Sequence, residues 1–85
     1  MEKPASPLGL AFAKVLRHHR TALGISQEDM ALSAGLSPRY ISLLEAGKHR
    51  PSLATMEALA KRLAVPLSEL IREAEARAAA AAEED

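Results

Sequence analysis

The side chains of this sequence that could take part in chemistry are mainly charged groups, and the cations among them are concentrated in its first half. Residues 1–50 hold seven lysines and arginines against four acidic residues, whereas residues 51–85 hold four against seven. The chain as a whole is neutral, so its two halves carry opposite net charges. A basic half indicates contact with nucleic-acid phosphates, although ordinary scatter of charge in a chain of this size gives a similar count.

No other residue pattern predicts a chemical site. The chain has no cysteine, no HExxH pattern and no glycine-rich phosphate loop. His18 and His19 are adjacent and would point about 100° apart on a helix, and His49 lies far along the chain. We therefore expect no metal, no cofactor and no enzymatic activity. His19 has apolar neighbours at helical spacing, so we expect it to be partly buried and hydrogen-bonded.

The elements that position these cations centre on residues 26–47, which contain two helix start signals. Ser26 and Ser37 are serine N-caps flanked by apolar residues, and Pro38 takes the first helical position, where a missing N–H has no effect. Only two residues, beginning with Gly35, separate the two predicted helices. Such helices cannot fold back as an antiparallel pair, so we expect them to cross at a large angle as a helix-turn-helix.

Three further helices complete a predicted all-α fold, because no strand pattern and no membrane-length apolar run of about 18 residues occurs. The first helix is predicted over residues 8–23, the fourth over 53–63 after a cap at Ser52, and the fifth from Pro66 or Leu67. We expect a flexible arm over residues 1–7, the helical domain over 8–74, and an alanine-rich acidic tail over 75–85 that can extend the last helix.

The expected core residues recur at helical spacing. In the two central helices they are Met30, Ala31, Ala34, Ile41 and Leu44. In the first and fourth helices they are Leu8, Phe12, Val15, Leu16, Leu23, Leu53, Met56, Leu59, Ala60 and Leu63.

The chain resembles a known family. The span 8–71 is similar to the helix-turn-helix domain of lambda-type repressors and Cro-like regulators, the xenobiotic-response-element-type family, and it covers roughly three-quarters of the chain. The matching residues are Arg20, Gly24 to Glu28, Ala31, Gly35 to Ser37, Ile41, Ser42, Glu45 to Lys48, Arg50 to Leu53, Leu59, Ala60 and Leu63 to Val65.

The resemblance implies that the second helix of the motif reads DNA in the major groove, which admits an α-helix. Arg39 is the best candidate reader, because its planar fork can donate to both acceptors of a guanine. Tyr40 either reaches the DNA or is a half-buried spacer. The family often has polar readers where this chain has Pro38 and Leu43, and Leu43 would contact a thymine methyl group. The expected base contacts are Ser37, Arg39, Tyr40, Ser42 and Leu43.

The resemblance also assigns residues to the DNA backbone and to a structural ion pair. Arg20 and Glu45 match a buried pair that links the first helix to the end of the third, and Arg20 is also allowed a phosphate contact. Each cation is otherwise a plain surface charge. The expected phosphate contacts are Gln27, at the start of a helix whose free N–H groups favour anions, together with Arg17, Arg20, Lys48 and Arg50.

The resemblance implies a sequence-specific, double-stranded DNA-binding transcriptional regulator in a bacterial or phage cytoplasm. Family members commonly dimerise, so that two recognition helices meet successive major grooves about 34 Å apart. We therefore expect a homodimeric repressor of a palindromic operator, with Leu67, Leu70 and Ile71 at the dimer interface. The other reading of these three residues is that they only close the core of one protomer.

One alternative remains open for the function. The chain can be a protein-interaction module, in which the helix-turn-helix is a scaffold and the acidic tail binds a protein partner. Small family members include controllers of restriction–modification systems and antitoxin-type autorepressors, which the sequence does not separate from a general regulator. Neither a membrane nor a small-molecule effector is expected as a partner.

Overall fold

Serine side chains cap the first four helices of the structure. The computed structural model describes residues 6–83, and in it Ser6, Ser26, Ser37 and Ser52 each accept a hydrogen bond from the main-chain N–H three residues later. This geometry satisfies a donor that the helix itself leaves without a partner. The caps predicted at the last three serines are confirmed. The helices are α1 (Pro7–Ala22), α2 (Gln27–Ala34), α3 (Pro38–Glu45), α4 (Leu53–Leu63) and α5 (Leu67–Glu83).

The predicted all-α fold is confirmed, and no strand occurs within residues 6–83. The arm expected over residues 1–7 lies outside the described residues up to position 5, but Ser6 caps α1 and Pro7 opens it. At the other end α5 includes the alanine-rich segment and continues to Glu83. Across the described residues, no helix combines the length and the apolar character needed to cross a bilayer.

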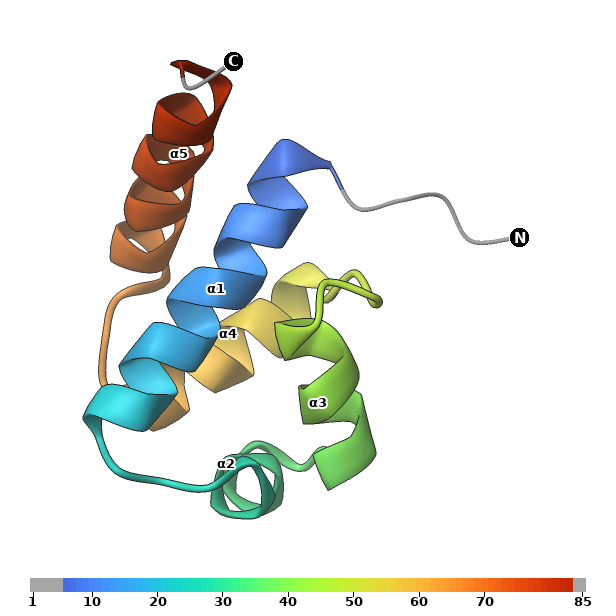
Figure 1. Cartoon of the computed structure of the whole chain (residues 1–85). Helices are drawn as coiled ribbons and strands as arrows, with labels where there is room; N and C mark the ends of the chain where they lie inside the picture. Colours follow the sequence, from blue (N-terminus) through green and yellow to red (C-terminus); the bar gives the residue numbers. More distant parts are fainter. Residues whose placement is uncertain (1–5, 84–85) are drawn as a thin grey trace.

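The first helix organises the packing. In Figure 1, α1 runs through the centre of the molecule, with α5 along one side of it and α3 on the other, and α4 packs against α2 and α5. Helix α5 runs antiparallel to α1 and makes the most extensive helix–helix contact of the fold. Helix α3 therefore lies on the side of α1 opposite α5.

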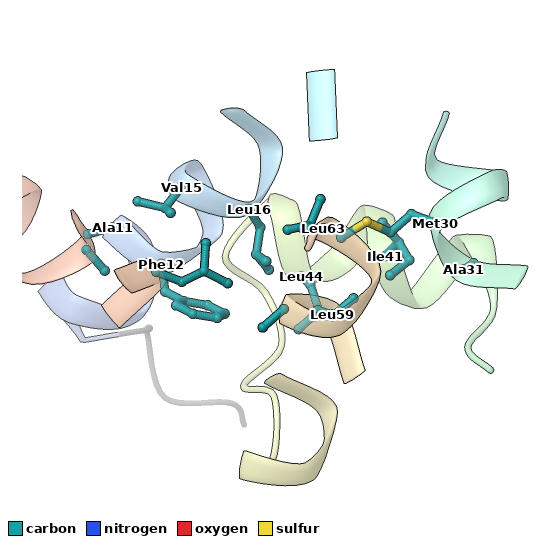
Figure 2. Packing of buried hydrophobic residues seen from close by; sticks show 13 residues of the cluster. Ala11, Phe12, Val15, Leu16, Met30, Ala31, Ile41, Leu44, Leu59 and Leu63 are labelled. Atoms are coloured by element: carbon teal, nitrogen blue, oxygen red, sulfur yellow. The ribbon is translucent and has the colours of Figure 1, made fainter. Parts of the chain in front are cut away.

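A single apolar core joins these helices. Figure 2 shows Phe12 and Leu16 of α1 continuing into Met30, Ile41 and Leu59 from the three following helices. The side chains of Met30, Ile41 and Leu59 are almost completely buried, and burying a side chain of this size contributes about 1.5–3 kcal/mol. The core positions predicted for α2 and α3 are confirmed at Met30, Ala31, Ile41 and Leu44.

The predicted burial is wrong for three residues, which are exposed. Leu8 and Leu23 are exposed because they lie at the two ends of the first helical segment, where neighbouring helices cover it least. Leu53 is 70% exposed because it is the first residue of α4 and points away from the bundle. Two small residues, Ala11 and Ala13, are buried on α1 in their place.

The structure also corrects one residue of the expected dimer interface. Leu70 is 0% exposed within a single protomer and belongs to the core, so its side chain has no surface to offer a second copy. Leu67 and Ile71 are half-buried against the same core and retain exposed surface.

His19 joins α1 to α5. Its Nε2 lies 3.0 and 3.1 Å from the two carboxylate oxygens of Glu73, and both residues are half-buried. The prediction of a partly buried, hydrogen-bonded histidine is confirmed.

The end of α4 carries a strained residue. Ala64 has a φ of 58°, whereas the other left-handed residues of the described chain are glycines. Its N–H and that of Val65 bond back to the carbonyls of Lys61 and Ala60, which is the same helix-ending motif that glycines form elsewhere in the chain. The Cβ atom of an L-residue is disfavoured in this conformation.

Replacing Ala64 with glycine is expected to stabilise the fold. Relief of the left-handed strain exceeds the extra flexibility of the unfolded chain, so we expect a gain of about 0.5–1 kcal/mol in the free energy of unfolding. Urea denaturation measures it. The matched control is Ala76→Gly on the exposed face of α5, which should lose a similar amount. A loss at both positions would contradict the assigned strain.

Candidate nucleic-acid interface

A glycine turn sets the angle between α2 and α3. Gly35 has a φ of 72°, its N–H bonds to the carbonyl of Leu32, and the next N–H, of Leu36, bonds to the carbonyl of Ala31 at 2.8 Å. This is a Schellman motif, which ends a helix with a left-handed residue. Figure 1 shows the result: α2 is seen end-on while α3 lies across it, so the two helices cross at a large angle. The predicted helix-turn-helix is confirmed.

One face of α3 is packed and the other is open to solvent. Ile41 and Leu44 are buried in the core, which fixes the rotation of the helix about its axis. The residues predicted to read bases then divide into two groups. Ser37, Arg39 and Ser42 are exposed, together with Pro38, whereas Tyr40 and Leu43 are half-buried.

The exposed polar groups differ in what they can still bind. The Ser37 hydroxyl oxygen already accepts the Tyr40 N–H at 3.1 Å. No side-chain hydrogen bond or ion pair occupies Arg39 among the described residues, so its guanidinium is available to a ligand. Arg39 is also in the first turn of α3, the part of a recognition helix that reaches base edges.

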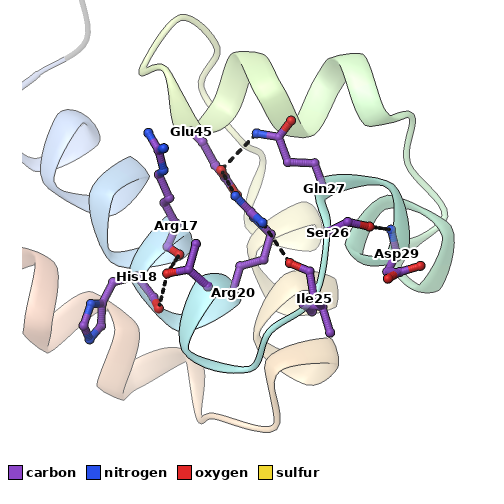
Figure 3. A network of polar contacts seen from close by, with 9 residues as sticks. Arg17, His18, Arg20, Ile25, Ser26, Gln27, Asp29 and Glu45 are labelled. Atoms are coloured by element: carbon purple, nitrogen blue, oxygen red, sulfur yellow. Dashed lines mark hydrogen bonds and ion pairs between the residues drawn. The ribbon is translucent and has the colours of Figure 1, made fainter.

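A buried network fixes α3 against α1 and α2 (Figure 3). The Nε and Nη2 atoms of Arg20 donate to the two carboxylate oxygens of Glu45 at 2.6 and 2.9 Å. Nη1 of Arg20 donates to the carbonyl of Ile25 at 2.8 Å, and Nε2 of Gln27 donates to Glu45 at 3.1 Å. The side chains of Arg20 and Glu45 are only 11% and 4% exposed. The side chains of Arg20 and Glu45 therefore join four segments of the chain.

The arginine of this network keeps its charge. The hydrogen bonds from Arg20 to Glu45 and the attraction between the two charges raise the pKa of Arg20 above its ordinary value, against the opposing effect of burial. The guanidinium therefore remains charged over the whole physiological pH range. A paired, fully hydrogen-bonded geometry is what makes burial of such charges tolerable.

The network includes two of the expected phosphate contacts and changes the role of one. Arg20 is buried and committed to Glu45 and Ile25, so its expected phosphate contact is corrected to a structural role. Gln27 supports α3 through Glu45 but remains half-buried at the first position of α2. Arg17, one turn before Arg20 on α1, is exposed and extends in the same direction as Arg20 in Figure 3.

The loop after α3 presents two further cations. Gly47 has a φ of 74°, and the Lys48 N–H bonds to the carbonyl of Leu43 at 2.9 Å, so α3 ends in a left-handed glycine cap. A Cβ atom at Gly47 would lie 2.6 Å from Cδ2 of Leu10, which adds close packing to the requirement for glycine. Lys48 and Arg50 then follow on the surface.

One contact near this face was missed by the sequence interpretation. The rings of Tyr40 and His49 lie against each other, with centroids 5.6 Å apart. No periodicity connects a residue at the start of a helix with one in the following loop, so the sequence contains no signal for this pair. Groups of three or more histidine, aspartate or glutamate residues placed to bind a metal are absent from the part of the chain that the structure describes.

Comparisons with known proteins agree with this geometry. The sequence model of the helix-turn-helix family matches residues 16–70. A relative from Sinorhizobium fredii, the HTH-type transcriptional regulator y4dJ, is 34% identical over 64 residues, which are 75% of this chain and 78% of the relative. An HTH-type transcriptional regulator of Methanothermobacter thermautotrophicus is 37% identical over 49 residues, covering 58% of this chain and 71% of that protein.

Two solved structures are similar over most of the chain. The clp gene regulator ClgR from Corynebacterium glutamicum aligns with a TM-score of 0.87 at 26% identity, over 91% of this chain and 82% of that one. The restriction-modification controller protein C.AhdI from Aeromonas hydrophila aligns with a TM-score of 0.70 at 38% identity, over 72% and 92%.

Proposed function

Because the chain belongs to the helix-turn-helix family of DNA-binding transcriptional regulators, we propose that it binds a specific duplex sequence through α3 in the major groove. The observation that carries this proposal is the open face of α3. Arg39 projects from its first turn and has no side-chain hydrogen bond or ion pair among the described residues. Its helix is anchored to the core by the buried side chains of Ile41 and Leu44. A guanidinium in that place can donate to both major-groove acceptors of a guanine.

The proposed phosphate contacts surround this reading face. Lys48 and Arg50 lie on the exposed loop after α3, Arg17 on the exposed face of α1, and Gln27 at the N-terminus of α2. Such contacts fix the register of the protein on the duplex and make its affinity depend on salt. Ser37 and Ser42 are the further polar groups on the reading face.

We expect Lys48→Ala to weaken binding almost equally on all duplexes and to reduce the salt dependence. Loss of one phosphate contact lowers the slope of log K against log [salt] by about 0.9 for each bound copy. Fluorescence anisotropy at several salt concentrations measures the slope. The matched control is Arg77→Ala, which removes an exposed cation from α5, on the side of α1 away from α3.

The salt series also tests the proposed function itself. Affinity of the native chain for a duplex should fall steeply between low and moderate salt. If the chain binds a protein partner instead, with an association that barely changes with salt and no affinity for duplexes, the alternative of a protein-interaction module replaces the DNA-binding proposal.

The functional unit that we propose is a cytoplasmic homodimeric repressor of a palindromic operator. A recognition helix of eight residues offers few base contacts, and a two-fold dimer doubles them by placing two such helices about 34 Å apart. Leu67 and Ile71 supply apolar surface on α5 for that interface, since both are only half-buried in the protomer.

A further inference from the structure

Two aromatic side chains meet beside the reading face. Tyr40 lies in the first turn of α3 and His49 in the loop after that helix, and their ring planes are tilted by 40° with centroids 5.6 Å apart. Rings at this separation attract each other beyond the effect of buried area alone. Tyr40 packs against the core with part of its surface, whereas His49 is exposed. The tyrosine ring is therefore the anchored member of the pair.

The main chain of the loop is held at its two ends. At one end the Lys48 N–H bonds to the carbonyl of Leu43, and at the other Ser52 caps α4. Between them, within the described chain, neither His49 nor Arg50 donates a main-chain hydrogen bond to another main-chain group. The contact with Tyr40 is thus an interaction that can orient the middle of the loop.

We propose that Tyr40 and His49 form a positioning pair that directs Lys48 and Arg50 toward the DNA backbone. The two cations are the chain neighbours of His49, so a fixed His49 ring restricts the backbone from which both project. This inference rests on the proposed function, and it gives Tyr40 a role other than the expected base contact. By packing on His49, the Tyr40 ring sets where Lys48 and Arg50 bind the phosphates, relative to the base edges that Arg39 contacts.

The ring contact is testable without DNA. In the native chain the ring protons of His49 should be shifted upfield in the NMR spectrum by the ring current of Tyr40. The shift should persist in Tyr40→Phe, which keeps the ring, and disappear in Tyr40→Leu. An identical His49 spectrum in all three proteins would overturn the pair.

The positioning role is tested by affinity and salt slope, with all variants compared at one fixed pH. We expect His49→Ala to bind a duplex about 2- to 10-fold more weakly for each bound copy, and to show a smaller salt slope because Lys48 and Arg50 lose their alignment. His49→Phe and Tyr40→Phe, which keep two stacked rings, should bind like the native chain. His49→Ala should stay folded with only a modest fall in melting temperature, because the substituted residue is exposed and only the ring contact is lost.

A double-mutant cycle completes the test. The variant carrying both Tyr40→Leu and His49→Ala should bind no more weakly than the weaker single variant, because either change breaks the same contact. Additive losses, or a loss in Tyr40→Phe equal to that in Tyr40→Leu, would overturn the positioning pair while leaving DNA binding intact. If the native chain binds no duplex, the proposed function itself fails, and the role of the pair fails with it.

Discussion

Replacing Glu45 with glutamine is expected to lower the free energy of unfolding by about 3–5 kcal/mol, because the Arg20 guanidinium is then buried without its counter-charge. Both side chains are nearly inaccessible, and three donated hydrogen bonds, from Arg20 and Gln27, end on this one carboxylate. Such a loss is large for a small domain, whose total stability is about 5–15 kcal/mol. In a domain of this size each kcal/mol lowers the melting temperature by about 4–8 °C.

Calorimetry or urea denaturation measures the effect, and the chain contains its own control. Glu69 pairs with Arg72 at 3.4 Å on the surface of α5, where both side chains are well exposed, so Glu69→Gln should change stability by less than about 1 kcal/mol. Replacing Arg20 and Glu45 together by methionine and leucine removes both charges and should recover much of the loss. Equal effects of Glu45→Gln and Glu69→Gln would show that the buried pair does not hold α3 in place.

The second large effect is expected in recognition. Arg39→Ala should weaken binding to the preferred duplex by about 1–3 kcal/mol for each recognition helix and relax specificity at one base pair per half-site. The side chain is exposed on α3, so the substitution should leave the fold intact. Discrimination at that base pair should therefore fall without any change in the melting temperature.

The measurement compares duplexes that carry each of the four base pairs at every position of the site. Lys48→Ala is the matched control, since loss of a phosphate contact weakens all duplexes alike. If Arg39→Ala gives that same uniform loss, Arg39 is a phosphate contact and the sequence is read by other residues.

The local structure of this chain is largely predictable from its sequence. Ser26, Ser37 and Ser52 begin helices and Gly35 and Gly47 end them, because each depends only on a few neighbouring residues. The cap at Ser6 and the strained end of α4 at Ala64 escaped prediction. Alanine disfavours the left-handed region, so the residue type itself does not mark Ala64 as the end of a helix.

Features that depend on the packing of distant elements were harder to predict. Leu8, Leu23 and Leu53 match the apolar spacing of a helix, but whether such positions are covered is decided by the neighbouring helices. Leu70 shows the reverse case. From the sequence it could lie in a dimer interface, but the structure buries its side chain completely within one protomer.

The contacts of the candidate site that join distant residues were also hard to predict from the sequence. The pairing of Arg20 with Glu45 was expected through the family resemblance, and periodicity alone would not have joined residues so far apart. The contact between Tyr40 and His49 had no signal of either kind, since it joins a residue in the first turn of α3 to one in the loop that follows the helix.

Selection of bound duplexes from a random pool tests the central claim most directly, because it asks whether the native chain reads sequence and does so as a two-fold dimer. We predict enrichment of one palindromic site, with half-sites whose centres are about one helical turn, or 10–10.5 base pairs, apart or a multiple of it. Recovery of the pool without an enriched sequence would contradict sequence-specific recognition by α3.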